Sequence, residues 1–317
     1  MKKRPLLIIG AVAIAAAAVI YFASRPVISR QGPAREAAGG ASGPAEIRIV
    51  AAENFYGNIA AQLGGDKVSV KSIISNPNID PHEYESSVED GIAITKARII
   101  IKNGLEYDTW MDKMISASPN PGRTVITAGK IAPRPLPGNP HVWYGADNVE
   151  AVANAITAAL VKADPPDKAL FEKNLSRFNA SLAPIRAKIN GIRSKYAGTP
   201  AGLTETIGLY LTRPMGLKVL TPFDFQKAIA EGNDPPAAGV AAANSQVDNK
   251  EIKILIYNSQ TVTPITTHMR NAARARGIPL VPVSETMPPG DTYQSWMLAQ
   301  LNAIANGLAT ATGATGR

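Results

Sequence analysis

The chain has 317 residues, of which 45% are hydrophobic and 18% charged, and it contains no cysteine. This composition excludes a disordered protein. The missing thiols exclude a disulfide scaffold, a thiolate zinc finger, an iron–sulfur cluster and a cysteine nucleophile. At about 150 residues per domain, the length predicts two lobes.

The net charge of +8 is concentrated near the amino terminus. Residues 1–44 hold six Lys and Arg residues against one Glu, which leaves 27 basic and 24 acidic residues in the remaining 273. So small an excess does not make a basic face for phosphates, and we therefore expect no nucleic-acid partner.

The first 44 residues have the pattern of an export segment followed by a tether. Lys2-Lys3-Arg4 precedes an uninterrupted run of apolar and small residues from Leu6 to Ala23, which is typical of a secretory signal. Such a run is also just long enough to span a membrane, so a cleaved signal and an uncleaved anchor are both open. A lipid anchor would need a cysteine. Residues 30–44 lack large apolar side chains and are predicted to be flexible.

In the first half of the remaining chain, short β-branched runs alternate with segments of helical composition. Strands are predicted at 47–50, 68–70, 99–101 and 124–126, and helices at 56–63 and 88–97. The second half repeats this pattern, with strands at 252–257 and 280–283 and helices at 206–213, 223–231, 264–276 and 292–309. This alternation is typical of parallel strands joined by crossover helices. The predicted fold class is therefore α/β, with two lobes that each contain a small, mostly parallel sheet flanked by helices.

The segment between the two halves has the most regular pattern in the chain. A capping box at Asp147-Asn148-Val149-Glu150 predicts a helix that runs to about Ala163. From Phe171 to Tyr196, apolar residues recur at alternating spacings of four and three, which predicts one long helix with a continuous apolar stripe. We interpret this helix as a spine that joins the lobes and bends at Pro184. An oligomeric coiled coil is the alternative.

The predicted organisation has four parts. A signal or membrane-anchor segment with its tether occupies 1–44, the N-terminal lobe 45–163, the connecting helix 164–197 and the C-terminal lobe 198–317. Because the spine would bury its stripe within its own chain, we expect a monomer.

Without cysteine, a transition-metal site has to be built from histidine and carboxylate. His82 and His141 each follow a proline directly, in a turn-rich stretch after a predicted strand. Proline restricts the local backbone, and the carboxyl ends of parallel strands form the rim where open α/β sheets bind ligands. Alternatively, each histidine caps a backbone group in a loop. His268 lies on a basic helical face and is interpreted as a solvated surface residue.

Three enzyme signatures are incomplete in this sequence. His82-Glu83 is followed by Ser86 where a zinc metalloprotease helix needs its second histidine. No Gly-x-Ser-x-Gly occurs, which argues against a serine hydrolase of that type. The turn at Leu63-Gly64-Gly65-Asp66 lacks the Gly-Lys ending of a phosphate-binding loop.

Several segments resemble motifs of the zinc- and manganese-binding solute receptors of ABC importers. They are residues 51–56, Asp80-Pro81-His82-Glu83-Tyr84-Glu85, residues 101–105 with Trp110, Asn139-Pro140-His141-Val142-Trp143, residues 204–211 with Met215-Gly216-Leu217, Gly232-Asn233-Asp234-Pro235, and Asp291-Thr292-Tyr293. The similarity extends over almost the whole exported domain, to about Leu308. It implies two α/β lobes joined by a rigid backbone helix, and a binding protein without enzymatic activity.

The resemblance also implies a ligand set, with His82 and His141 from the first lobe and Glu205 and Asp291 from the second. Two neutral imidazoles and two carboxylates would form a neutral complex with a divalent ion. The alternatives are an exposed loop carboxylate for Glu205 and a helix N-cap for Asp291. The chain departs from the family in three ways: it has no lipid-anchor cysteine, no histidine-rich loop, and Pro288-Pro289-Gly290 precedes Asp291.

We therefore predict a receptor, in the periplasm or on the outer face of the cytoplasmic membrane, that binds Zn²⁺ or Mn²⁺ between its lobes and delivers it to a membrane permease. The affinity order of divalent metals favours Zn²⁺, whereas two carboxylates keep Mn²⁺ open. Two other functions are considered. One is a metal-dependent hydrolase on the same scaffold, with Glu83 as base. The other is a surface adhesion or interaction protein in which a metal serves stability.

Overall fold

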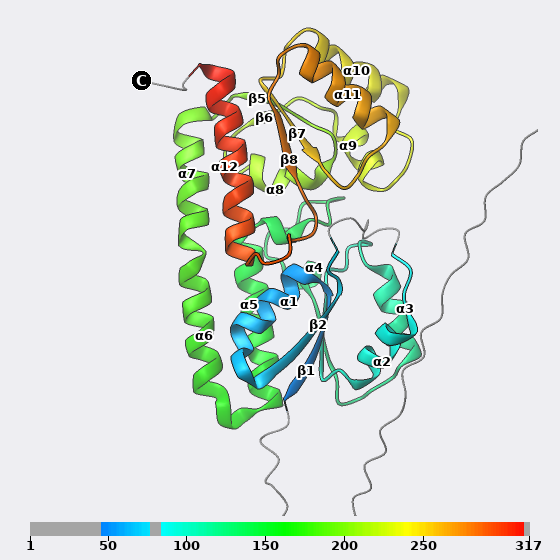
Figure 1. Ribbon diagram of the computed structural model, residues 1–317, viewed down its shortest axis with the longest axis vertical. Coiled ribbons are helices and arrows are strands. Elements are labelled where there is room, and N and C mark those ends of the chain that lie inside the picture. The colour runs from blue at the N-terminus through cyan, green and yellow to red at the C-terminus, as the bar shows by residue number, and fades with distance from the viewer. Residues whose placement is uncertain (1–45, 77–83, 314–317) are drawn as a thin grey trace, which may run out of the picture. The chain divides into compact units, whose positions relative to one another are not determined.

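The computed structural model describes residues 46–76 and 84–313 (Figure 1). The predicted export segment and His82 lie outside these residues. Within the described part of the chain, no helix is long and apolar enough to cross a membrane.

The first sheet has the strand order β2-β1-β3-β4, and all its neighbours are parallel. Its strands are Ile47–Glu53 (β1), Val68–Ile74 (β2), Ile99–Lys102 (β3) and Thr124–Thr127 (β4). β-Branched residues dominate them because such side chains suit a buried, pleated surface. All four predicted strands of this lobe are confirmed, and β1 and β2 extend beyond the predicted carboxyl ends.

Alternation along β1 divides the packing of the first lobe into two layers. Ile47, Ile49 and Ala51 face the large core that includes helices Asn54–Gly64 (α1) and Ala146–Ala163 (α5). Val50 and Ala52 face a smaller core with helices Val88–Lys96 (α2) and Thr109–Ala117 (α3). A short helix, Ala128–Ile131 (α4), follows β4. The sheet is therefore covered on both faces, as parallel sheets require.

The second sheet is also parallel throughout, in the order β6-β5-β7-β8. Its strands are Pro200–Leu203 (β5), Lys218–Val219 (β6), Ile254–Asn258 (β7) and Leu280–Val283 (β8). β5 was not predicted, because it lacks β-branched residues. The small residues of β5 are needed, because a Cβ atom at Gly202 would come within 2.6 Å of Ile252 Cδ1.

Helices cover both faces of this sheet as well. Leu255 of β7 packs in a core with Phe223–Ala230 (α9), Ala237–Asp248 (α10) and Pro264–Ala275 (α11). Ile254 and Ile256 face the large core, where Tyr293–Thr312 (α12) lies. A one-turn helix, Leu209–Thr212 (α8), follows β5. The predicted fold class is confirmed.

The predicted spine consists of two consecutive helices, Lys168–Ser181 (α6) and Ala183–Tyr196 (α7), which meet at Leu182. Pro184 lies in the first turn of α7, and because it has no backbone N–H it cannot continue the bonding pattern of α6. The apolar stripe is buried in the large core. Helix α6 packs on α1 and α5, and α7 packs on α12, so the spine contacts both lobes (Figure 1).

The predicted capping box at the start of α5 is wrong. The helix begins at Ala146 with Gly145 as its N-cap, and no side chain caps it. Asp147 lies inside the first turn and instead pairs with Arg186 of α7 at 3.2 Å. A Cβ atom at Gly145 would lie 2.8 Å from Asn148 Nδ2, so a larger residue there would have to displace the Asn148 side chain. The predicted carboxyl end at Ala163 is confirmed.

Candidate metal centre

His141 lies in a turn of the first lobe that is hydrogen-bonded to the second lobe through Asn139. Asn139 Oδ1 accepts the backbone N–H of His141 at 3.0 Å and lies 2.8 Å from Nδ1 of the same imidazole. Asn139 Nδ2 donates to the carbonyl of Thr206 in the second lobe at 2.8 Å. Because a carbonyl oxygen only accepts, it holds a proton on Nδ1 and leaves the lone pair of Nε2 for a metal.

Aromatic side chains fix the plane of this imidazole. The ring of Trp143 lies edge-on to His141 with a centroid separation of 5.1 Å, and Tyr107 approaches at 6.0 Å. Phe55 of α1 stacks on Trp143 at 4.6 Å. Since all of these rings are buried, His141 has little freedom to turn.

Glu205 lies two residues beyond β5 and is buried in an extended backbone conformation. Its Oε2 lies 3.9 Å from Nε2 of His141, and its Oε1 accepts a hydrogen bond from Asn258 Nδ2 at 2.8 Å. Asn258 is the last residue of β7, the strand beside β5. The alternative of an exposed loop carboxylate at Glu205 is therefore excluded.

Glu285 is a buried carboxylate that the sequence analysis missed. It lies two residues beyond β8. Glu205 also lies just beyond the carboxyl end of its strand, so both glutamates are on the same side of this parallel sheet. Its Oε1 accepts from Asn258 Nδ2 at 2.5 Å, and its Oε2 accepts from the hydroxyl of Tyr107 in the first lobe at 2.7 Å. A carboxylate just past a predicted strand was the signal that could have identified it.

His141, Glu205 and Glu285 form a group in which one donor atom from each residue lies within 4.8 Å of the others. The group combines one imidazole from the first lobe with two carboxylates from the second. Two buried carboxylates so close together repel each other unless a cation or a proton intervenes. Bonds of about 2.0–2.2 Å from nitrogen and oxygen donors to Zn²⁺ would need only a small contraction of this group.

The other sequence-predicted site residues have different positions. Asp291 precedes α12, and its Oδ1 accepts from the hydroxyl of Ser295 at 2.9 Å, so the structure does not bring it into the group. Thr292, rather than Asp291, is the N-cap of α12, in a capping box with Ser295. His82 lies outside the described residues. His268 is exposed on α11, as predicted.

The turn that supplies Tyr107 has an unusual backbone. Leu105 and Glu106 have φ values of 56° and 66°, which non-glycine residues rarely adopt. Asp108 holds the turn by accepting the backbone N–H groups of Asn103 and Gly104 at 2.6 and 2.7 Å. Burial raises the pKa of Asp108, which these two hydrogen bonds oppose. The strained turn therefore positions Tyr107 so that its hydroxyl can donate a hydrogen bond to Glu285.

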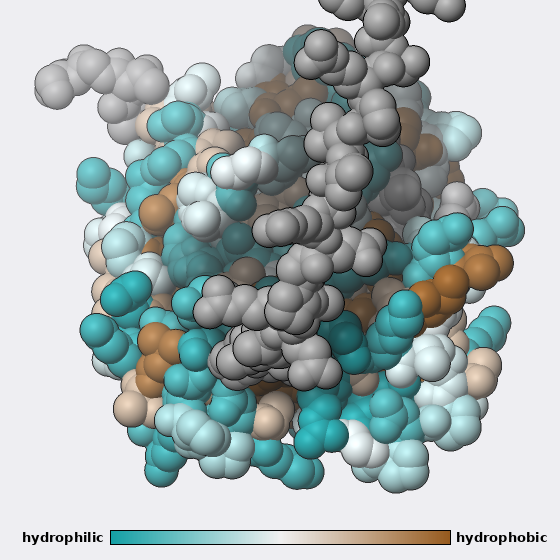
Figure 2. Space-filling model, turned by 60° about the horizontal axis from the view of Figure 1, so that its bottom comes forward, coloured by the Kyte–Doolittle hydropathy of each residue, from teal (hydrophilic) through white to brown (hydrophobic). Residues whose placement is uncertain are grey.

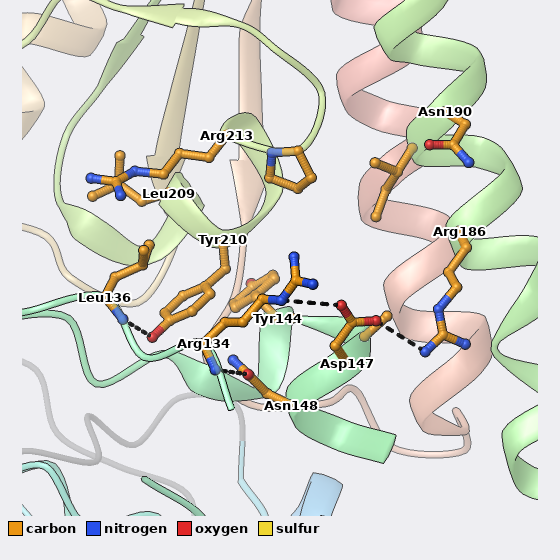
Figure 3. Close-up of a pocket in the computed structure, with 14 residues that line it drawn as sticks. Arg134, Leu136, Tyr144, Asp147, Asn148, Arg186, Asn190, Leu209, Tyr210 and Arg213 are labelled. Atoms are coloured by element: carbon orange, nitrogen blue, oxygen red, sulfur yellow. Dashed lines mark hydrogen bonds and ion pairs between the residues drawn. The ribbon is translucent and has the colours of Figure 1, made fainter. Parts of the chain in front are cut away.

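A cavity of about 490 Å³ lies next to the His141 segment, between the spine and both lobes (Figure 3). Tyr210 and Tyr144 contribute to its wall, and the Tyr210 hydroxyl accepts the backbone N–H of Leu136 at 2.7 Å. Asp147 and Arg186 pair across its rim. The cavity wall includes no histidine, and we do not assign it to the metal group.

The sequence matches, over residues 49–307, the family described as zinc-uptake complex component A, periplasmic. The chain belongs to this family. The family consists of substrate-binding proteins of metal ABC importers and not of enzymes, which confirms the predicted receptor class and the predicted export from the cytoplasm.

Curated relatives of this family member differ in the metal that they are named for. The manganese ABC transporter substrate-binding lipoprotein scaA of Streptococcus gordonii is 25% identical, over 84% of this chain and 91% of its own length. The iron ABC transporter substrate-binding lipoprotein MtsA of Streptococcus pyogenes is 24% identical, over 83% of this chain and 89% of its own length.

Solved structures support the fold of the family. The periplasmic zinc-binding protein TroA from Treponema pallidum superimposes with a TM-score of 0.69 at 18% identity, covering 83% of this chain and 99% of TroA. The Ni²⁺ complex of FpvC from P. aeruginosa has a TM-score of 0.69 at 22% identity, covering 86% and 99% of the two chains. At these identities the likeness concerns the fold alone.

Proposed function

We propose that this family member binds one divalent transition metal through His141, Glu205 and Glu285 and delivers it to the membrane permease of an ABC importer. The observation that carries the proposal is the convergence of these three buried donors from two lobes. His82 is the predicted fourth donor. Glu285 takes the place that the sequence analysis gave to Asp291.

The donor set narrows the choice of ion only partly. One imidazole and two carboxylates suit both Zn²⁺ and Mn²⁺, and the affinity order favours Zn²⁺. We therefore propose Zn²⁺ as the tightest-bound ion and Mn²⁺ as its competitor. Relatives named for manganese, iron and zinc support a divalent metal as the cargo of this chain.

Calorimetric titration of chelator-stripped protein with Zn²⁺, Mn²⁺ and Fe²⁺ tests the proposal. We expect His141→Ala, Glu205→Gln and Glu285→Gln each to weaken Zn²⁺ binding by about a hundredfold or more, or about 2.7 kcal/mol. Asp291→Asn is the matched control, because it also removes a carboxylate of the second lobe, and its affinity should equal that of the wild type. A loss in Asp291→Asn as large as in Glu285→Gln would contradict the assignment.

Fluorescence gives an independent signal for the same site. Trp143 is fully buried against His141, so its emission should change when a metal fixes the imidazole. The response should saturate at one ion per chain and disappear in His141→Ala. Emission that does not respond to Zn²⁺ or Mn²⁺ would place the binding site elsewhere.

We further propose that the receptor works as a monomer. The apolar stripe of the spine packs on its own lobes, and on the face shown in Figure 2 hydrophobic side chains are scattered among hydrophilic ones. Light scattering behind a sizing column should give the monomer mass with and without metal. A stable dimer under both conditions would refute this part of the proposal.

A further inference from the structure

Helix α1 of the first lobe presents a row of amide side chains to the second lobe. Asn54, Asn58 and Gln62 follow one another at intervals of four residues, so they lie on one face of the helix. All three are half-buried. The beginning of α12 lies next to α1 (Figure 1). This amide row therefore belongs to the contact between the lobes.

Asn54 bonds the backbone of the segment that carries Glu285. Its Nδ2 donates to the carbonyl of Met287 at 2.7 Å, and its Oδ1 accepts the N–H of the same residue at 3.1 Å. Met287 is buried and lies two residues beyond Glu285, a proposed ligand. Because Asn54 begins α1 directly after β1, these two hydrogen bonds join the first lobe to the second.

The residues after Met287 have little ability to anchor the segment. Pro288 and Pro289 have no backbone N–H and so cannot donate a hydrogen bond to the first lobe. Gly290 follows with a φ of 87°, and the N–H of Asp291 returns to the carbonyl of Pro288 at 3.2 Å, within the same turn. Met287 is therefore the last backbone donor that ties the Glu285 segment to the first lobe before this turn.

Other contacts hold the segment on the opposite side of Met287. In the second lobe, Gln260 Oε1 accepts the N–H of Glu285 at 2.6 Å. From the first lobe, the hydroxyl of Tyr144 donates to the carbonyl of Ser284 at 2.7 Å. With Asn54, the first lobe thus bonds the backbone on both sides of Glu285.

We propose that Asn54 is a positioning residue of the metal site, which holds the Glu285 segment against the first lobe and thereby slows the release of the bound ion. This inference rests on the proposed function. Asn54 does not belong to the metal group and acts on Glu285 through the backbone of Met287. Release requires Glu285 to move away from His141. Without the two hydrogen bonds of Asn54, this movement costs less free energy.

The test is the rate at which Asn54→Ala releases Zn²⁺ to an excess of chelator in a stopped-flow instrument. We expect the dissociation rate to rise about tenfold and the association rate to change by less than about threefold. Hydrogen exchange of the metal-free variant should be faster in the peptide that contains Met287. A wild-type dissociation rate, or unchanged exchange in this peptide, would overturn the inference.

Gln62→Ala is the matched control. Gln62 and Gln294 form a reciprocal pair of amide hydrogen bonds at 3.0 and 2.9 Å, so this variant also removes two bonds between α1 and the second lobe. Gln294 lies on α12, beyond the proline turn, and the dissociation rate should therefore stay within about twofold of the wild type. Equal acceleration in both variants would show a general loosening of the lobes and overturn the positioning role.

Glu285→Gln separates this inference from the proposed function. If Glu285→Gln binds Zn²⁺ like the wild type, the proposed ligand set fails. If Glu285→Gln weakens binding while Asn54→Ala releases Zn²⁺ at the wild-type rate, only the role of Asn54 fails. In the Glu285→Gln background, Asn54→Ala should change Zn²⁺ affinity by less than about twofold, because its effect passes through Glu285. Additive losses would contradict this route.

Stability distinguishes positioning from folding. Asn54→Ala and Gln62→Ala should lower the melting temperature of the metal-free protein to a similar extent, because each loses two hydrogen bonds of the same kind. Asn54→Asp keeps the size of the side chain and the acceptor for the N–H of Met287, but it has no donor for the carbonyl. Its dissociation rate should also rise, and it serves as the kinetic test if Asn54→Ala does not fold. Wild-type release by Asn54→Asp would overturn the proposal.

Discussion

Two clusters of charged side chains lie at the His141–Asn148 segment, and they differ mainly in burial. In the metal group, the side chains of His141 and Glu205 are at most 1% exposed. In the second cluster, Arg186 of the spine pairs with Asp147 and Glu150, and these three side chains are 35%, 52% and 39% exposed. Water stabilises each charge of the second cluster separately, so its pairs contribute little.

The buried group depends on partners that the protein or its ligand supplies. Two carboxylates of the second lobe share the amide of Asn258, and the hydroxyl of Tyr107 reaches Glu285 from the first lobe. Removing one partner from such a group leaves a desolvated charge uncompensated. Burial therefore separates the two clusters: the buried group is the one proposed to hold the metal, whereas the exposed pairs should adjust only surface stability.

Among the residues that support the metal group without belonging to it, the largest effect is expected from Asn258→Ala. This change removes the donor that holds both carboxylates in place, so the glutamates should separate in the metal-free protein. Outer-sphere partners of metal ligands typically contribute 10–100-fold to affinity, and we expect about a hundredfold loss for Zn²⁺ here. Titration calorimetry measures it, with Asn249→Ala, an exposed asparagine of the same lobe, as the control. Equal affinities of the two variants would show that Asn258 does not organise the group.

A smaller loss should follow Tyr107→Phe, which removes only the hydroxyl that reaches Glu285. The ring would still pack against Trp143, at a centroid separation of 4.9 Å, so the fold should be retained. We expect Zn²⁺ affinity to fall by about tenfold. Tyr196→Phe on α7 serves as the control. Wild-type affinity in Tyr107→Phe would mean that the bond between the lobes does not orient Glu285.

How far the fold was predictable depended on the chemistry of individual strands. β3 is Ile-Ile-Ile-Lys and is evident from the sequence, because its side chains prefer an extended backbone. β5 is Pro-Ala-Gly-Leu and has no such preference. Its strand conformation comes from pairing with β6 and β7 and from the crowding at Gly202, both of which are long-range contacts. The strand propensity of the β5 residues gives no information on these long-range contacts.

The residues of the metal group also differ in how far they could be predicted from the sequence. The turn with Asn139, Pro140 and His141 is a local pattern, so His141 could be proposed from the sequence. For Glu285 the only local signal is a carboxylate just past a predicted strand, and its place in the group depends on the sheet order β5-β7-β8, which places Asn258 between the two glutamates. Asp291 instead lies beside a capping box that a local pattern already explains. The predicted role of His82 remains a prediction.

Asp90 adds a third case to this comparison. It is a buried charge that the protein itself stabilises with hydrogen bonds and an ion pair. Burial alone would raise the pKa of Asp90, but hydrogen bonds from Lys71, Ser87 and Tyr84 hold it well below its ordinary value. We expect Asp90→Asn to lower the free energy of unfolding at pH 7 by about 2 kcal/mol. A depressed pKa stabilises the fold above the unfolded value of about 3.9, so the difference from the wild type should shrink as the pH falls below 4.

Urea unfolding of the wild type and Asp90→Asn at several pH values measures this dependence. The control is Asp66→Asn in the same lobe, whose side chain is exposed and whose effect should be small at every pH. A destabilisation that stays constant down to about pH 3 would show that the shape of the Asp90 side chain matters and not its charge.

The smallest effect is expected from Arg186→Met, which removes the cation of the exposed cluster and keeps much of the aliphatic length. Its pairs with Asp147 and Glu150 are partly exposed, so the free energy of unfolding should change by less than about 1 kcal/mol. Salt screens such pairs, and the difference from the wild type should disappear near 1 M NaCl. Metal affinity should not change. A loss of Zn²⁺ affinity in Arg186→Met would mean that the spine transmits its contacts to His141, and the two clusters could then no longer be treated as independent.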